Sequence, residues 1–170
     1  FRMQLPPIED NLYVIRDGEP VNYYQTNTPI ELPTTWSEKD KEVRAVWVAT
    51  VSNIDVPMMT TEAAYKAQLI AIIERVKAVH MNTIFFQVRP MNDAFYYSEF
   101  APMSRYINGT EGFDPGFDVL AFMVEEGHKR GIEIHAWLNP YRVSTGTDDK
   151  MTQLNALHED NFARKNPNLV

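Results

Sequence analysis

The sequence predicts an α/β protein in which strands and helices alternate along the chain. Three short runs rich in apolar, β-branched and aromatic residues occur at 43–51, 83–88 and 132–140, as expected of strands that pack on a hydrophobic core. The stretches between these runs contain apolar residues at helical spacing, together with residues that cap helices. This alternation predicts parallel neighbouring strands, joined by helices that lie outside the sheet.

The composition is typical of a globular protein with a sizeable core. The 170 residues are 44% hydrophobic and 23% charged, which separates the chain from disordered proteins. The 16 basic and 23 acidic residues give a net charge of -7, and no Lys/Arg cluster is present that could follow a phosphate backbone. We therefore expect no nucleic-acid partner. No apolar run approaches the ~18 residues of a membrane span, so none is expected.

The first 42 residues differ from the rest of the chain. They show no sustained helical or alternating period, and they contain five of the 11 prolines, namely Pro6, Pro7, Pro20, Pro29 and Pro33. We expect residues 1–42 to form an extended lead-in, with short strands allowed, and residues 43–170 to form the folded domain.

The first strand and helix follow directly after the lead-in. The run VRAVWVATV, residues 43–51, predicts a strand that is covered on both faces, with Trp47 in the core. After a loop, Thr60 or Thr61 can cap a helix. The apolar positions of this helix follow the helical repeat and are Tyr65, Leu69, Ile72, Ile73, Val76 and Val79.

The second strand, 83–88, ends before Pro90, which cannot donate a hydrogen bond to a sheet. A long loop over 90–117 follows, and Asp118 predicts the N-cap of a second helix that runs to about Arg130. Gly131 ends this helix. The run IEIHAWLNP, residues 132–140, predicts the third strand, and one or two weaker helices are expected between Thr152 and Lys165.

Two architectures are compatible with this order of elements. A doubly wound sheet needs about five strand–helix units, whereas only three strands lie between Val43 and Leu138. In a TIM (β/α)8 barrel, the two units seen here, which together span about 90 residues, imply roughly 350 residues for all eight units. We favour the barrel because the insertions follow the strand ends, where barrel enzymes build their sites.

Residues 43–170 are therefore expected to be the N-terminal part of a TIM (β/α)8 barrel, about three βα units, within a longer chain. Such a part exposes a barrel edge and an apolar face. We expect it to self-associate through that edge when it is alone.

Several stretches of the sequence resemble one known family. The stretch VRAVWVATVSNIDVP, and residues 84–143, which begin IFFQVRPMNDAFYY and end IEIHAWLNPYRV, are similar to the glycosyl-hydrolase-like 10 family of bacterial barrel proteins, which are often described as lipoproteins. The resemblance implies a glycoside hydrolase, with a cell-wall glycan, peptidoglycan stripped of its peptides, as the substrate of some members. It also implies export to the periplasm or cell surface, with a lipid anchor as one form of attachment.

The chain departs from the family pattern at two places. Val56 and Pro57 stand where the family usually has a Trp-Pro pair. The family's Asp-Gly and Asp-Asp-Tyr segment, which follows the third strand, has no counterpart before Val170. The resemblance therefore implies that catalytic carboxylates lie beyond residue 170 and that residues 1–170 alone are inactive.

Glycoside hydrolysis ordinarily needs two carboxyl groups across the scissile bond. The strand ends offer Asp55 after the first strand and Asp93 after the second, and no carboxylate directly follows the third. Asp93 is the best catalytic candidate in these residues. The alternative is a structural loop aspartate that caps a turn or pairs with Arg89.

Substrate-binding candidates lie at the ends of the second and third strands. Alternation sends His135, Trp137 and Asn139 to one side of the third strand, so Asn139 would reach its carboxyl end. Its amide can bind sugar hydroxyls, and Tyr141 and Arg142 can stack or pair with an anionic group. The alternative is that Asn139 and Arg142 tie neighbouring loops together.

The remaining candidates carry weaker signals, and for each a structural role is also open. His135 is more often a core residue than a substrate contact, Gln87 can point to the interior, and Arg89 can pair with a carboxylate. The long loop contains three consecutive aromatic residues that could serve as sugar platforms or as a small loop core: Phe95, Tyr96 and Tyr97.

No metal site or cofactor is expected, because the four histidines lack paired ligand spacing; they are His80, His128, His135 and His158. The favoured function is a glycoside hydrolase that uses carboxylate general acid/base catalysis on a polysaccharide. A non-catalytic glycan-binding barrel is the alternative. A phosphosugar lyase or aldolase barrel is a third possibility, and the absence of a lysine at the strand ends weighs against it.

Overall fold

A computed structural model describes residues 13–32 and 42–170. The chain divides into two compact units, Phe1–Glu42 and Val43–Val170. In the first unit, β1 (Ile15–Arg16) and β2 (Glu19–Pro20) form a small antiparallel hairpin. The lead-in therefore contains short strands, while its predicted features at Pro6, Pro7 and Pro33 lie outside the described residues.

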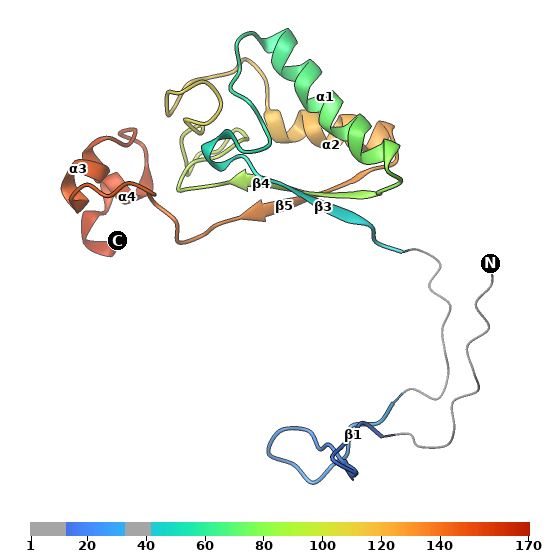
Figure 1. The fold of residues 1–170 in the computed structure, drawn as a ribbon. Coiled ribbons are helices and arrows are strands. Elements are labelled where there is room, and N and C mark those ends of the chain that lie inside the picture. Colours follow the sequence, from blue (N-terminus) through green and yellow to red (C-terminus); the bar gives the residue numbers. More distant parts are fainter. Residues whose placement is uncertain (1–12, 33–41) are drawn as a thin grey trace. The chain divides into compact units, whose positions relative to one another are not determined.

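The second unit is built on a parallel sheet of three strands (Figure 1). The strands β3 (Ala45–Val48), β4 (Thr83–Arg89) and β5 (Glu133–Leu138) lie side by side in chain order. The prediction of an α/β protein with parallel neighbouring strands is confirmed. Strand β3 is shorter than the apolar run that predicted it, because the chain leaves the sheet and forms a 3-10 turn, η1 (Val51–Asn53).

Two helices join these strands, and both predicted caps are confirmed. In α1 (Glu62–Ala78), the Thr61 side chain accepts a hydrogen bond from Ala64 N at 3.2 Å. In α2 (Val119–Lys129), the Asp118 carboxylate accepts one from Ala121 N at 2.8 Å. These bonds satisfy N–H groups that the first turn of a helix leaves without a partner.

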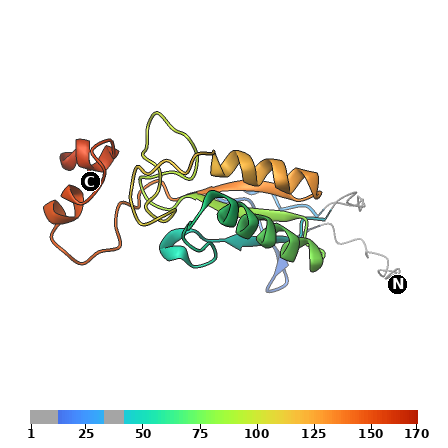
Figure 2. The same cartoon turned by 90° about the horizontal axis from the view of Figure 1, so that it is seen from above.

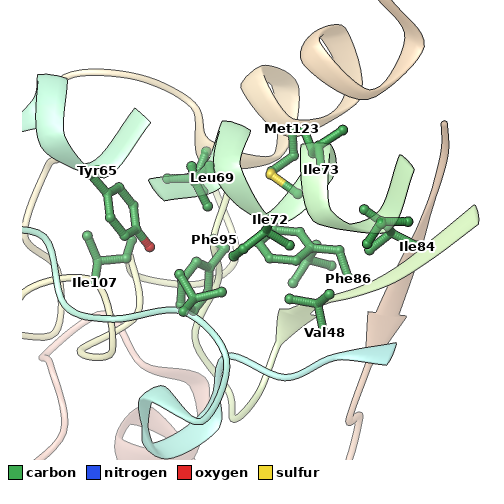
Figure 3. Close-up of a cluster of buried hydrophobic side chains, with 14 of the residues drawn as sticks. Val48, Tyr65, Leu69, Ile72, Ile73, Ile84, Phe86, Phe95, Ile107 and Met123 are labelled. Carbon is green, nitrogen blue, oxygen red and sulfur yellow. The ribbon is translucent and has the colours of Figure 1, made fainter. Parts of the chain in front are cut away.

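Both helices lie on the same face of the sheet (Figures 1 and 2). The hydrophobic core fills the space between them and this face, and the rings of Phe86 and Phe95 meet edge to face there at 6.2 Å (Figure 3). Five of the six apolar positions expected on the first helix are buried in this core. Val79 is the exception, because it follows the last residue of α1 and is 61% exposed.

The other face of the sheet carries an aromatic cluster, which we call the open face; it comprises Trp47, Phe85, His135 and Trp137. Trp47 stacks on Phe85 at 4.6 Å and meets Trp137 edge to face at 4.9 Å. No helix of the described residues covers this face, and Trp47 is 58% exposed. The expectation that the first strand is covered on both faces, with Trp47 in the core, is therefore wrong for the described part of the chain.

Beyond β5 the chain forms two short helices, α3 (Lys150–Asn155) and α4 (Phe162–Lys165), and a last 3-10 turn, η2 (Pro167–Leu169). The expectation of one or two weak helices in this tail is confirmed. Across residues 13–32 and 42–170, no helix combines the length and the apolar character that crossing a membrane requires.

Candidate functional site

The turn that follows β4, residues Arg89 to Asp93, is the centre of the candidate site. Asn139, at the end of β5, donates from its backbone N to Arg89 O at 3.0 Å and from its side-chain Nδ2 to Pro90 O at 3.3 Å. The carboxyl ends of parallel strands meet at one edge of a sheet. The structure thereby brings three of the predicted residues, Arg89, Asp93 and Asn139, to the same turn.

Asp93 is buried at this turn, with 1% of its surface exposed. Its Oδ2 accepts a hydrogen bond from Ser104 Oγ at 2.5 Å, and its Oδ1 accepts one from Met91 N at 3.0 Å. Burial raises the pKa of Asp93, although these two bonds act in the opposite direction. Such a carboxyl group keeps its proton to a higher pH than a surface aspartate, as a general acid must.

The same contacts describe the structural alternative for Asp93. Its bond to Met91 N closes the turn, as expected of a loop aspartate. Arg89 contacts Asp93 through the backbone, because its Nε donates to the Asp93 carbonyl oxygen at 3.4 Å. The hydrogen-bond partner of the carboxylate is therefore Ser104, where the sequence suggested Arg89.

As the pH rises from the ordinary pKa of an aspartate to the raised pKa of Asp93, the native protein is expected to lose stability, and Asp93→Asn is expected to lose less. The pKa of Asp93 is raised above its ordinary value of 3.8. In this window the folded protein retains a proton that the unfolded chain releases, so the free energy of unfolding falls as pH rises. Asparagine can accept from Met91 N and donate to Ser104 Oγ without ionising. Urea unfolding at several pH values measures the effect.

Asp114→Asn is the matched control for this prediction, because it should change the pH dependence in the opposite direction. Hydrogen bonds from Gly116 N and the Tyr97 hydroxyl lower the pKa of Asp114. Its stabilising effect is present above the unfolded pKa and is lost as the pH falls. The same sign of change in both variants would contradict the assignment of Asp93.

A cavity of about 310 Å³ lies beside Asp93, between the long loop and the chain that follows β5. Its lining combines charged side chains, among them Arg105, Glu111 and Asp148, with apolar ones such as Met91 and Leu157. A titratable group with a raised pKa at the wall of a cavity is a common property of functional sites. The cavity therefore favours a role for this loop in binding a ligand that has both polar and apolar surfaces.

Glu111 connects this loop to the tail of the chain, and the sequence reasoning missed it. Its side chain is only 6% exposed. The carboxylate accepts hydrogen bonds from Arg105 Nη2 at 3.1 Å, His158 N at 2.8 Å and Asn161 Nδ2 at 2.7 Å. Asn161 also donates to Asn92 O at 3.2 Å. One carboxylate thus fastens the tail to the loop that carries Asp93.

A close contact at Gly112 depends on the same interface. A Cβ atom at this position would lie 2.5 Å from His158 Cδ2, and the φ of Gly112 is +83°. We expect Gly112→Ala to lower the free energy of unfolding by about 2 kcal/mol or more, because φ strain and the collision add. Chemical denaturation measures this loss.

Gly109→Ala provides the control for that substitution. Gly109 also has a positive φ, +98°, but nothing lies within 4 Å of its Cβ position. It reports the backbone strain alone. Equal losses in the two variants would show that His158 moves away at no cost.

Tyr141 and Arg142 line a second, larger cavity of about 750 Å³, to which Asn92 of the turn after β4 also contributes. Lys150 and Phe162, from the tail, contribute to the same cavity. The Tyr141 side chain is 94% exposed. The Arg142 guanidinium and the exposed Tyr141 ring are therefore available there for an anionic or ring-shaped ligand, whereas Lys150 Nζ already donates to Val170 O.

Gln87 and Asp55 hold the turn that follows β3. Gln87 is completely buried, and its Oε1 accepts hydrogen bonds from Thr50 N and Val51 N, both at 2.9 Å. Asp55 Oδ2 accepts from Ala49 N at 2.7 Å. The structure therefore gives both residues structural contacts, and Gln87 has no exposed atom with which to contact a ligand.

The same turn is joined to the long loop by Asn53. Its Nδ2 donates to Tyr106 O at 2.6 Å and to Val56 O at 3.0 Å. Asn53 has a φ of +54° and its neighbour Ser52 a φ of +53°. These values lie in the left-handed region, which asparagine tolerates better than most residues.

The aromatic loop packs largely on the main hydrophobic core. Phe95 is completely buried, and Tyr96 is half-buried against the main core. Tyr97 is 53% exposed and donates its hydroxyl to Asp114 at 2.8 Å. Of the three proposed platforms, only Tyr97 presents most of its ring to solvent.

His135 lies on the open face of β5, where its ring meets Phe85 edge to face at 5.2 Å. Sequence alternation therefore placed it correctly beside Trp137. Within residues 13–32 and 42–170, no three His, Cys, Asp or Glu side chains come together in a group that could hold a metal ion.

Comparison with known proteins identifies relatives of the chain. The profile of the family described as Glycosyl hydrolase-like 10 matches residues 42–169. The chain is 45% identical over 136 residues to "Glycosyl hydrolase YngK" of Bacillus subtilis (strain 168), which covers 79% of this chain and 26% of that protein. It is 39% identical over 124 residues to "Glycosyl hydrolase DigH" of Escherichia coli (strain K12), which covers 68% and 28%.

These matches fix the family, while the chain spans only about a quarter of the length of the curated relatives it matches. The matched region includes all three strands of the parallel sheet and the turn that carries Asp93. The resemblance found in the sequence is confirmed: the chain belongs to the Glycosyl hydrolase-like 10 family.

Proposed function

We propose that this chain is part of a glycoside hydrolase that cuts a bacterial cell-wall glycan, or a related polysaccharide, by carboxylate general acid/base catalysis. The observation that carries the proposal is the turn after β4, where Arg89, Asp93 and Asn139 meet at one edge of the sheet. Two relatives whose names describe glycosyl hydrolases support it.

We propose further that residues 43–170 form the first three βα units of a TIM (β/α)8 barrel. The strands follow one another in the sheet in chain order, and both helices cover one face (Figure 1). A barrel has this arrangement, whereas a doubly wound sheet places helices on both faces. The aromatic side chains of Trp47, Phe85 and His135 would then fill the barrel interior, and Trp137, one layer nearer the carboxyl ends of the strands, would lie at its mouth.

Catalysis needs a second carboxyl group besides Asp93. Asp55, the other acidic candidate in these residues, is occupied at the turn after β3. We propose that carboxylates beyond residue 170 supply the second carboxyl group. Residues 1–170 alone are then inactive. Asp93 serves either as the protonated general acid or as a residue that positions the general acid.

The test is hydrolysis by the full-length protein. Purified protein is incubated with peptidoglycan stripped of its peptides, with chitin oligomers and with cellulose, and new reducing ends are measured. We expect reducing ends from the first substrate. Their absence from all three polysaccharides would overturn the proposal. Asp93→Asn is expected to lower kcat at least tenfold if Asp93 donates a proton.

A glycan-binding barrel without hydrolysis is the second candidate function. It is favoured by one observation: both carboxylate oxygens of Asp93 are hydrogen-bonded within the protein and the residue is buried. Glycan binding without new reducing ends, together with no acidic residue at the end of the fourth strand, would support it.

For either function, we propose that the protein works in the periplasm or at the cell surface, with a lipid anchor as one means of attachment. Its polysaccharide substrate would be located there. Cell fractionation with an antibody to the protein tests this proposal, and recovery from the cytoplasm alone would contradict it.

A further inference from the structure

Trp137, near the end of β5 on the open face, is held by a chain of hydrogen bonds. The indole Nε1 of Trp137 donates to Asn139 Oδ1 at 2.9 Å. Asn139 Nδ2 in turn donates to Pro90 O at 3.3 Å, at the end of β4. Residues two apart in a strand share one face of the sheet, so this pairing follows from the alternation of the sequence.

The hydrogen bond to Asn139 orients the indole ring from its edge. The hydrogen bond joins the ring at its edge, because an indole N–H lies in the ring plane. Trp47 meets Trp137 at an interplanar angle of 86°. Trp137 lies on the open face, opposite Gln87 in the sheet register, and it is half-buried there.

A flat, oriented aromatic ring beside the candidate site matches one chemical class of ligand. Pyranose rings have apolar C–H faces that pack on indole rings, and ligand sites commonly combine such surfaces with a few polar groups. Arg89, which is half-buried at the turn after β4, supplies a polar group at the same edge of the sheet.

We infer that Trp137 is the stacking platform for a pyranose ring of the glycan and that Asn139 is a positioning residue that acts through Trp137. The inference rests on the proposed glycan-directed function. It changes the role that the sequence suggested for Asn139, because both polar groups of its amide are already bonded inside the protein.

A double-mutant cycle in the full-length protein tests this assignment. The variants are Trp137→Ala, Trp137→Phe, Asn139→Ala and the double variant Trp137→Phe with Asn139→Ala. The probes are chitohexaose and glycan strands from peptidoglycan stripped of its peptides. Isothermal titration calorimetry gives Kd, reducing-end assays give KM and kcat, and thermal unfolding checks that each variant folds. Phe100→Ala, at an exposed aromatic residue of the long loop, is the control.

Trp137→Ala is expected to raise Kd or KM at least tenfold, and Trp137→Phe to raise it about threefold because a flat ring remains. Asn139→Ala is expected to weaken binding threefold to tenfold in the native background. In the Trp137→Phe background it should change nothing, because phenylalanine has no N–H for Asn139 to accept. Phe100→Ala should bind as the native protein does.

The outcomes separate the inference from the proposed function. If Asn139→Ala weakens binding equally in both backgrounds, or if folded Trp137 variants bind like the native protein, the assignment is wrong even when hydrolysis is observed. If glycans bind without being cut and the cycle behaves as expected, the assignment stands and the hydrolase proposal fails. If neither probe is bound or cut, both are wrong.

Discussion

Phe86→Ala is expected to lower the free energy of unfolding by about 3–5 kcal/mol, the range for removing a fully buried aromatic side chain. Phe86 is completely buried between the sheet and the two helices, and Figure 3 shows it among side chains from α1, α2 and the sheet. The cavity left by alanine cannot close, because these elements are held apart by their remaining contacts. Urea or guanidinium denaturation measures the loss.

Phe85→Ala is the matched control, because it removes the same side chain from the next position of β4. Phe85 lies on the open face and is only half-buried in the described residues. In residues 1–170 we expect a clearly smaller loss than for Phe86→Ala. In a chain that closes the proposed barrel over this face, the two losses should become similar. A small loss at Phe85 in both chains would contradict the barrel.

Glu111→Ala is expected to detach the tail from the long loop, at a cost of about 3 kcal/mol. The substitution removes the acceptor of the His158 backbone N–H and one of the two acceptors of the Asn161 amide, a residue that is 1% exposed. Hydrogen bonds to charged groups contribute about 1.5–3 kcal/mol each, and removing one partner of a buried group costs the most. The cost is moderated because the Arg105 side chain is 38% exposed, so solvent already screens its ion pair with Glu111.

Hydrogen exchange measures this detachment, because local opening exposes the amides of the opened segment before the core unfolds. We expect faster exchange at His158 and Ala163, while strand β4 keeps its protection. Glu111→Gln is the control. Its amide oxygen can still accept one of the hydrogen bonds, so the effect should be intermediate. Unchanged exchange in Glu111→Ala would show that the tail is held by its apolar contacts alone.

The elements whose signals are local could be predicted from the sequence. Thr61 and Asp118 cap helices through bonds to residues three positions away, so the sequence itself displays both partners. The meeting of Asn139 with the turn after β4 was also predictable, because parallel strands end at a common edge. The parallel sheet follows from the alternation of strands and helices.

The rest could not be predicted, because it depends on contacts between irregular segments. Glu111 and Asn161 are 50 positions apart, and neither lies in a stretch with a period that would bring them together. The sequence does not reveal that no helix of the described residues covers the face that carries Trp47, because an apolar run has the same pattern whether one face or both are covered. Gln87 was assigned to the ligand, although its buried amide holds the turn after β3.

The hydrogen bonds that hold the turn after β3 affect the entropy cost of ligand binding. Gln87 fixes the backbone at Thr50 and Val51, and Asn53 fixes the long loop at Tyr106. Neighbouring loops that are already rigid lose little conformational entropy when a ligand arrives. A polymer that docks here would therefore meet a preorganised rim, and its affinity would be limited by the polymer's own loss of freedom.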